Sequence, residues 1–388
     1  MKKSLLALAV AGAFTGAAFA QSSVTLYGRV DVGLQKVNEP AGSTVSALSG
    51  AVAGDTLNVV QGSGSRVGFQ GAEDLGAGWK AIFQIEHRFD PDTGTISAQQ
   101  NNNRVCEDAA GVITAVQTAD ANGNFLTDCP TGTTARVTGT RERFWQGRSY
   151  VGLSGAAGTL KLGREYTPAF WVGIAADPWG YDTIAQVGTG PTIPGSVARF
   201  ANIIDYQSPN WGGFTFEVAY VPSETASNAG VGGTDPGDKD GYGANVQWSG
   251  GPVYVGAAYE KNVQITNAVA DVTLLNFTGS VKFGPAKVIA AYAKGESEAP
   301  VTNATTDTTG IVLAATFDVG AGQIRFGGTQ TKTEPPGVTA SKLTKIGLGY
   351  HHNLSKRTTL YVDAARAKQK DPDLTARTGF DLGIKHNF

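Results

Sequence analysis

The last twelve residues of the chain alternate strictly between apolar and polar side chains. Positions 380, 382, 384 and 388 hold Phe, Leu, Ile and Phe, whereas positions 377, 381 and 385 hold Arg, Asp and Lys. In a β-strand neighbouring side chains face opposite sides, so one face of this segment is apolar and the other is charged. A soluble sandwich could also bury such a strand. The aromatic residue at the last position, Phe388, favours a barrel with lipid outside and water inside.

The same alternation predicts sixteen strands along the chain. Seven short turns alternate with eight long loops between them, and this is typical of outer-membrane barrels, which have short periplasmic turns and long extracellular loops. The predicted strands are residues 24–37, 65–71, 79–89, 143–153, 158–166, 199–208, 213–221, 240–249, 252–263, 272–283, 286–295, 310–319, 322–331, 342–353, 356–367 and 376–388.

The first twenty residues have the pattern of a secretory signal peptide. Lys2 and Lys3 precede an apolar stretch, and Ala18-Phe19-Ala20 is a small-x-small cleavage site. A membrane anchor is the alternative, which the short stretch and the cleavage site disfavour. Cleavage after residue 20 would leave residues 21–388, enough for one large barrel or for two or more soluble domains.

Composition and charge agree with the barrel. No apolar run after residue 20 approaches the ~18–20 residues that a membrane-spanning helix needs. The mean hydropathy of −0.12 resembles that of a soluble protein. A membrane barrel can have the same value, because only every second residue of its strands touches lipid. The chain has 31 basic and 33 acidic side chains, and this weakly acidic balance argues against a nucleic-acid binder.

Four segments of the chain together resemble the trimeric Gram-negative general porins of β-proteobacteria. They are SSVTLYGRVD (22–31), SRVGFQGAEDLG (65–76), LKLGREYTP (160–168) and LSKRT (354–358), and Phe388 completes the set. The resemblance covers essentially the whole chain. It implies an all-β, 16-stranded antiparallel transmembrane barrel, present in the outer membrane as a homotrimer. It also implies that the third long loop, about 167–198, folds into the barrel and narrows the pore.

The partners that this resemblance implies are the lipid bilayer and lipopolysaccharide of the outer membrane, together with permeating ions and small hydrophilic solutes. We expect no cofactor, no metal ion and no bond chemistry. A channel of this class acts through the width of its pore and the charges that line it.

Strand parity and position in the third loop predict which residues line the pore. They are Arg29, Asp31, Arg66, Lys80, Glu86, Arg88, Arg148, Arg164 and Arg199 from the wall, and Asp177 and Asp182 from the loop. Arg164 shares the parity of apolar Leu160 and Leu162, so only a bulge would turn it inward.

The nominated residues form a basic wall that faces the acids of the loop. Arginine stays charged at every relevant pH, so we expect a weak preference for anions, with Arg29 and Arg66 nearest to the permeating ions. The alternative is that the arginines only pair with wall carboxylates and hold the loop in place.

Cys106 and Cys129 are the two cysteines of the chain, and both lie in the second long loop, 90–142. In an exported protein we expect them to form a disulfide. Closing this loop should stabilise the fold by ~3 kcal/mol in the chain-entropy model. The resemblance implies that this loop reaches a neighbouring subunit, so the bridge would stiffen that contact. Metal binding by two cysteines with no nearby histidine is the weaker alternative.

Three other functions stay open at this point. A channel with a preferred solute, such as phosphate or an organic anion, is close to the first hypothesis. A barrel protease or lipase would need a Ser/His or Asp/His constellation at the rim, and the four scattered histidines disfavour it. An adhesin or structural barrel would need a plug domain, and no spare segment is long enough to form one.

Overall fold

The computed structural model describes residues 23–38, 56–96, 103–107, 113–118, 134–138, 144–188, 197–223, 240–263, 271–298 and 304–388. Within these ranges the chain is nearly all β-structure, with one short helix, α2 (Pro168–Ile174). No helix in this part of the chain is long and apolar enough to cross a membrane. The predicted signal peptide, 1–20, lies outside the described residues.

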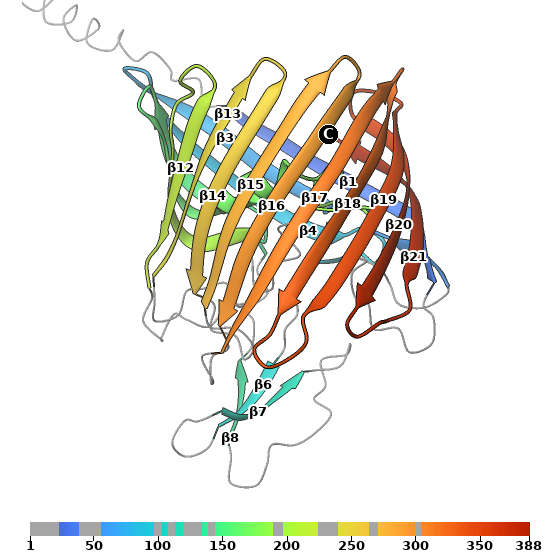
Figure 1. Ribbon diagram of the computed structural model, residues 1–388. Helices are drawn as coiled ribbons and strands as arrows, with labels where there is room; N and C mark the ends of the chain where they lie inside the picture. The colour runs from blue at the N-terminus through green and yellow to red at the C-terminus, as the bar shows by residue number, and fades with distance from the viewer. Residues whose placement is uncertain are drawn as a thin grey trace, which may run out of the picture.

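Sixteen strands form a closed antiparallel barrel, as predicted (Figure 1). Each strand pairs with its neighbours along the chain, and β1 closes the wall by pairing with β21, where Leu34 lies opposite Leu382. The strands of the wall are β1 (Ser23–Asn38), β3 (Arg66–Gly76), β4 (Trp79–Asp90), β9 (Ser149–Gly155), β10 (Gly158–Tyr166), β11 (Arg199–Gln207), β12 (Phe214–Val221), β13 (Gly241–Gly250), β14 (Val253–Val263), β15 (Asp271–Phe283), β16 (Ala286–Glu298), β17 (Thr305–Val319), β18 (Gly322–Glu334), β19 (Ser341–Asn353), β20 (Thr358–Lys370) and β21 (Arg377–Asn387).

The last residue lies on the outer surface where the barrel closes. Phe388 and Gly28 exchange two backbone hydrogen bonds, each 3.1 Å long. A Cβ atom on Gly28 would meet the ring of Phe388. Gly28 shares its parity with Leu26 and Val30, which are exposed on the outside of the wall. The terminal aromatic ring therefore covers the glycine of the first strand on the apolar face, as its position in the alternation predicts.

The alternation of side chains sorts apolar residues to the outside and polar residues to the inside. On β21, Leu382 and Ile384 are about half exposed (51% and 48%), whereas Asp381 is buried at 1%. Such a wall is stable because lipid covers the apolar face. Buried apolar clusters occur inside where the third loop packs on the wall, for example around Trp179 and Ile184.

Three strand ends differ from the prediction by five or more residues. β9 begins at Ser149 and not at 143, because the backbone of residues 144–148 bends, although Gly147 and Arg148 still hydrogen-bond to the backbone of Glu86 on β4. β3 continues to Gly76, since the chain reverses within Ala77 and Gly78, which both have positive φ. β17 begins at Thr305, before the predicted 310, because polar side chains on both faces hide the alternation there while the backbone still pairs with β16.

Short additional strands lie in the first two long loops. β2 (Leu57–Val60) pairs with β1, and β5 (Thr95–Ile96) pairs with β4. A separate three-stranded sheet, β6 (Asn103–Glu107), β7 (Ile113–Thr118) and β8 (Thr134–Thr138), lies within the second loop. The predicted bridge between Cys106 and Cys129 lies outside the residues whose side chains are described, so it stays a prediction.

Candidate functional site

The third loop leaves the wall at the end of β10 and returns to it at the start of β11. Its two ends are joined by a hydrogen bond from the Thr167 N–H to the Ala198 carbonyl (3.1 Å). Thr167 caps helix α2 by accepting from the Phe170 N–H through its hydroxyl, and Pro168 occupies the first turn, where its missing N–H costs nothing. These local signals make the chain turn into a helix directly after the strand.

Polar side chains of two wall strands, β13 and β15, hold α2 against the inner surface of the barrel. The amides of Asn245 on β13 and Asn276 on β15 donate to the carbonyls of Pro168 (3.0 Å) and Ala169 (3.4 Å). The hydroxyl of Thr278 donates to the carbonyl of Val172 (2.8 Å). The helix therefore lies inside the barrel and not above it.

Asp177 organises the turn that follows the helix. Its buried carboxylate accepts from the backbone N–H groups of Trp179 (3.1 Å), Tyr181 (3.0 Å) and Val187 (3.3 Å). A single carboxylate thus holds both arms of the loop tip. Burial raises the pKa of Asp177 to about 6, although these three N–H groups favour its charged form.

Two wall carboxylates anchor the loop tip on the opposite side of the barrel. The Trp179 indole donates to Asp363 on β20 (2.7 Å), and the Ile184 N–H donates to Asp381 on β21 (2.9 Å). The loop thus crosses the lumen from β13–β15 to β20–β21. Both carboxylates have the lumen parity of their strands, but the sequence gives no sign that they would bind the loop.

Between the loop and the facing wall lies a cavity of about 880 Å³. Seven cationic side chains and three carboxylates contribute to its lining. The cations are Arg29, Arg66, Arg88, Arg148, Arg199, Arg325 and Lys385, and the carboxylates are Glu86, Asp177 and Asp182. This excess of fixed positive charge in a confined aqueous space attracts anions.

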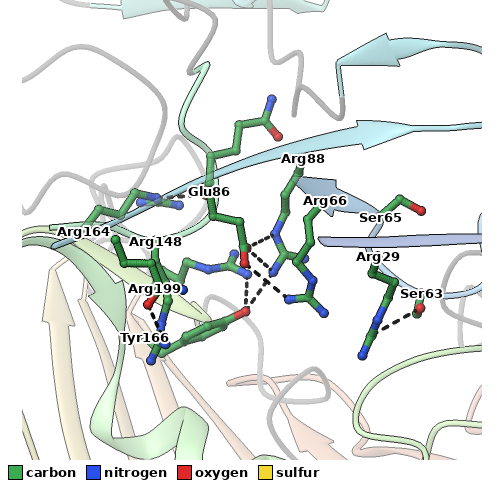
Figure 2. A network of polar contacts seen from close by, with 12 residues as sticks. Arg29, Ser63, Ser65, Arg66, Glu86, Arg88, Arg148, Arg164, Tyr166 and Arg199 are labelled. Atoms are coloured by element: carbon green, nitrogen blue, oxygen red, sulfur yellow. Dashed lines mark hydrogen bonds and ion pairs between the residues drawn. The ribbon is translucent and has the colours of Figure 1, made fainter. Parts of the chain in front are cut away.

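Three of these arginines form a row across neighbouring strands, which we call the arginine row (Figure 2). Arg29 on β1 lies directly opposite Arg66 on β3, and Arg66 lies directly opposite Arg88 on β4. Like charges in this position destabilise a sheet unless counter-charges lie close. The arrangement therefore concentrates positive charge along one side of the cavity.

Two carboxylates partly neutralise the arginine row. Glu86 lies beneath it, at 2.9 Å from Arg88 and 3.7 Å from Arg66. Asp182 of the loop pairs with Arg29 at 3.1 Å. Three guanidinium groups thus share two carboxylates. Arg66 has the longest of these contacts, so it is the most available to an ion in the pore.

A second group of arginines surrounds Tyr166 at the end of β10 (Figure 2). The phenolic oxygen of Tyr166 accepts from Arg199 (2.6 Å) and from Arg88 (2.9 Å). The guanidinium of Arg199 lies 4.2 Å from the centre of the same ring, and that of Arg148 lies 5.4 Å from it. Arg148 also pairs with the buried carboxylate of Glu165 at 2.7 Å.

Tyr166 and Glu165 are not among the pore-lining residues predicted from the sequence. Glu165 lies on the same face of β10 as Lys161 and Gly163, opposite to the face of Leu160 and Leu162, so strand parity places it inside the barrel. Tyr166 is the last residue of its strand, where alternation ends, and only its contacts in the fold reveal its role.

Three of the nominated residues lie away from the cavity lining. Lys80 is exposed next to the short turn between β3 and β4, because it follows that turn directly. Asp31 is fully buried in the wall, where its carboxylate accepts from Ser63 (2.5 Å) and Tyr361 (2.7 Å). Both side chains have the lumen parity. Lys80, however, lies too close to the end of the barrel to reach the cavity, and Asp31 is too deeply buried to contact an ion there.

Arg164 keeps the outward parity of Leu160 and Leu162. Its guanidinium donates to the carbonyl of Gln146 (3.1 Å). A register shift does occur between β10 and β11, but Gly163 pairs with Ile203 while Glu165 pairs with Phe200, so the extra residue lies on β11. This bulge therefore leaves the direction of Arg164 unchanged.

Among the residues that the structure describes, no group of three or more His, Cys, Asp or Glu side chains is arranged to hold a metal ion. The site consists of fixed charges and aromatic rings around a water-accessible space. Such an arrangement can select and guide ions.

Comparisons with known proteins agree with this geometry. The family model of the Gram-negative porins matches residues 7–372. The outer membrane porin protein 32 of Delftia acidovorans is 30% identical over 421 aligned residues, and an outer membrane porin of Bordetella pertussis is 27% identical over 446; each alignment covers 100% of both chains. Among solved structures, an anion-selective porin from Comamonas acidovorans has a TM-score of 0.70 and 25% identity, covering 95% of this chain and 100% of that one.

Proposed function

The chain belongs to the Gram-negative porin family, and from that premise we propose that its pore weakly prefers anions because of the arginine row. As a porin it forms an outer-membrane channel for the passive diffusion of ions and small hydrophilic solutes. The homotrimer and the contact with lipopolysaccharide that the sequence resemblance implies belong to the same proposal. Catalysis has no part in it.

The observation that carries the proposal is the direct cross-strand alignment of Arg29, Arg66 and Arg88 on the wall that faces the loop. Three guanidinium groups with two carboxylate partners leave unneutralised positive charge where the lumen is occupied by the loop. A passing anion gains attraction there that a cation does not. The similarity to an anion-selective porin supports the same sign of selectivity.

The experiment that tests the proposal is the zero-current potential of single channels in a KCl gradient. We expect stepwise conductance and a potential whose sign shows a higher permeability for Cl⁻ than for K⁺. Equal permeability would contradict the preference, and the arginines would then serve only to hold the loop. A cation-favouring sign would mean that the loop carboxylates dominate the field.

The acidic side of the cavity makes this preference depend on pH. Burial raises the pKa of the Asp182 carboxyl, and the nearby cations, Arg29 first, only partly offset this effect. Asp182 therefore becomes neutral at a higher pH than an exposed aspartate, and each neutralised carboxylate makes the lining more positive. We expect the anion preference to increase when the bath is acidified from about pH 7.5 to about pH 5.

The matched variant for the pH experiment is Asp182→Asn. It removes the same charge at every pH, so the anion preference should already be stronger at neutral pH and should rise less on acidification. A pH dependence as large as in the wild type would show that other carboxylates cause it.

A further inference from the structure

The outer surface of the barrel carries a cluster of cations at the long-loop ends of β19 and β20, which are neighbours in the wall (Figure 1). Alternation places Arg366, Lys368 and Lys370 on the outward face of β20, and Lys342 on that of β19. We call these four residues the outer basic groove. Lys342 lies directly opposite Lys370, a like-charge pair that is unfavourable in a sheet without an anion nearby.

The four cations surround a depression of about 460 Å³, together with Thr344 and Ile346. No carboxylate lines it. Towards the short-turn side the same outward face becomes apolar, with Leu348 and Val362 exposed at 55% and 45%. The groove therefore lies where the apolar belt of the barrel ends, and it joins a cationic part to an apolar part.

Other outward lysines at the same end of the barrel have carboxylate partners. Lys261 pairs with Asp271 (3.7 Å) and Lys332 with Glu334 (2.6 Å). Lys294 lies between Glu296 (3.0 Å) and Asp307 (3.6 Å). The charges of these lysines on β14, β16 and β18 are thus neutralised within the chain.

The outer basic groove differs from these sites. Only Lys368 has an acidic partner, Asp373 at 3.3 Å, and both side chains are more than half exposed. Within the described part of the chain, no carboxylate pairs with Lys342, Arg366 or Lys370. Three cations at the edge of a lipid-facing surface thus lack a counter-charge among the residues that the structure describes.

We propose that the outer basic groove binds a phosphate group of lipid A, the phosphorylated lipid part of lipopolysaccharide in the outer leaflet. Long loops mark the extracellular side of such barrels, so the groove lies at the level of the outer-leaflet headgroups. Lysine and arginine bind phosphate strongly, and clusters of them next to an apolar surface recognise anionic lipids. The acyl chains of the same lipid would lie on Ile346 and on the apolar wall below it.

This proposal requires the outer-membrane barrel but not the anion preference of the pore. The groove is outside the wall and the arginine row is inside it. Removing the groove cations should therefore leave the zero-current potential in KCl unchanged, and the two proposals can fail separately.

The test is native mass spectrometry of the folded full-length barrel with bisphosphorylated lipid A. The triple variant Lys342→Gln, Arg366→Gln, Lys370→Gln should retain lipid A about tenfold to a hundredfold more weakly than the wild type. Lys294→Gln is the matched control, because it removes an outward lysine that already has acidic partners, and it should bind as the wild type does. The single variant Lys370→Gln, at an exposed position, gives the same comparison should the triple variant not fold.

Three outcomes would overturn the proposal. Equal retention of lipid A by the wild type and the groove variants would exclude the groove as the binding site. Equal retention of fully dephosphorylated lipid A would assign binding to the apolar wall alone. Displacement of lipid A by inorganic phosphate at equal concentration would make the groove a site for free phosphate.

Discussion

The variant Arg66→Glu should reverse the ion preference of the channel. Arg66 lies between Arg29 and Arg88 in the arginine row, and its contact with Glu86, at 3.7 Å, is the longest ion pair of that group. The substitution changes the local charge by two units, so the row would then hold two guanidinium groups and three carboxylates. The new carboxylate would have a guanidinium on each side, which should let the barrel fold normally.

The size of the effect follows from Coulomb's law. One unit charge about 6 Å from an ion in water contributes ~0.7 kcal/mol, so a change of two units shifts the energy of each ion by ~1.4 kcal/mol, about tenfold in its local concentration. The shifts of an anion and a cation have opposite signs, so the anion-to-cation ratio should change by up to about a hundredfold at low salt. At higher ionic strength screening reduces the effect, and we expect a smaller shift in concentrated KCl. The measurement is the zero-current potential of single channels at two salt concentrations.

Lys80→Glu is the matched control for this experiment. It makes the same change in charge on the neighbouring strand β4, but Lys80 is exposed beside the short turn and does not line the cavity. We expect it to shift the zero-current potential far less than Arg66→Glu does. Equal shifts from the two variants would show that the total charge of the lumen, and not the arginine row, sets the preference.

Strand parity was sufficient to predict the barrel and much of its lining. The alternation of apolar and polar residues is a direct consequence of a wall with lipid on one side and water on the other, so sixteen strands were identified with most ends within a few residues. The same rule placed Arg29, Arg66 and Arg88 inside. Their alignment in one row depends on the register between strands, which turn lengths set and which a single strand does not reveal.

Parity predicts a direction but not a height along the barrel or a degree of burial. For this reason it grouped Lys80, at the mouth, and Asp31, inside the wall, with residues of the cavity. It also treated Arg148 as part of a regular strand, whereas β9 begins after it. The exposure of Lys80 follows from the turn directly before it, whereas the burial of Asp31 depends on contacts with Ser63 and Tyr361, which are distant in sequence.

The path of the third loop is the clearest example of such packing. Asp177 was nominated as a charge in the pore, and it does line the cavity. Its carboxylate oxygens, however, are occupied by three backbone N–H groups of the loop tip. A residue predicted for its charge therefore has a second role, because its hydrogen bonds fix the conformation of the loop that occupies the lumen.

Asp177→Ala should accordingly widen the pore while leaving the barrel folded. The substitution leaves three buried N–H groups without an acceptor, at a cost of ~1–3 kcal/mol each, which the loop can avoid by leaving its path. The wall does not depend on this residue, because its sixteen strands pair with one another. We expect single-channel conductance to rise roughly twofold, with entry of larger sugars in liposome swelling.

Asp177→Asn distinguishes the effect of the hydrogen bonds from the effect of the negative charge. The asparagine oxygen can still accept from the Trp179 and Val187 N–H groups, which both bind the same carboxylate oxygen, whereas its amide nitrogen cannot accept from Tyr181. Conductance should therefore stay closer to the wild type than in the alanine variant, although both variants lose the same negative charge. If both raise conductance equally, loss of charge is the cause. If neither does, the contacts of Trp179 with Asp363 and of Ile184 with Asp381 are enough to hold the loop across the lumen.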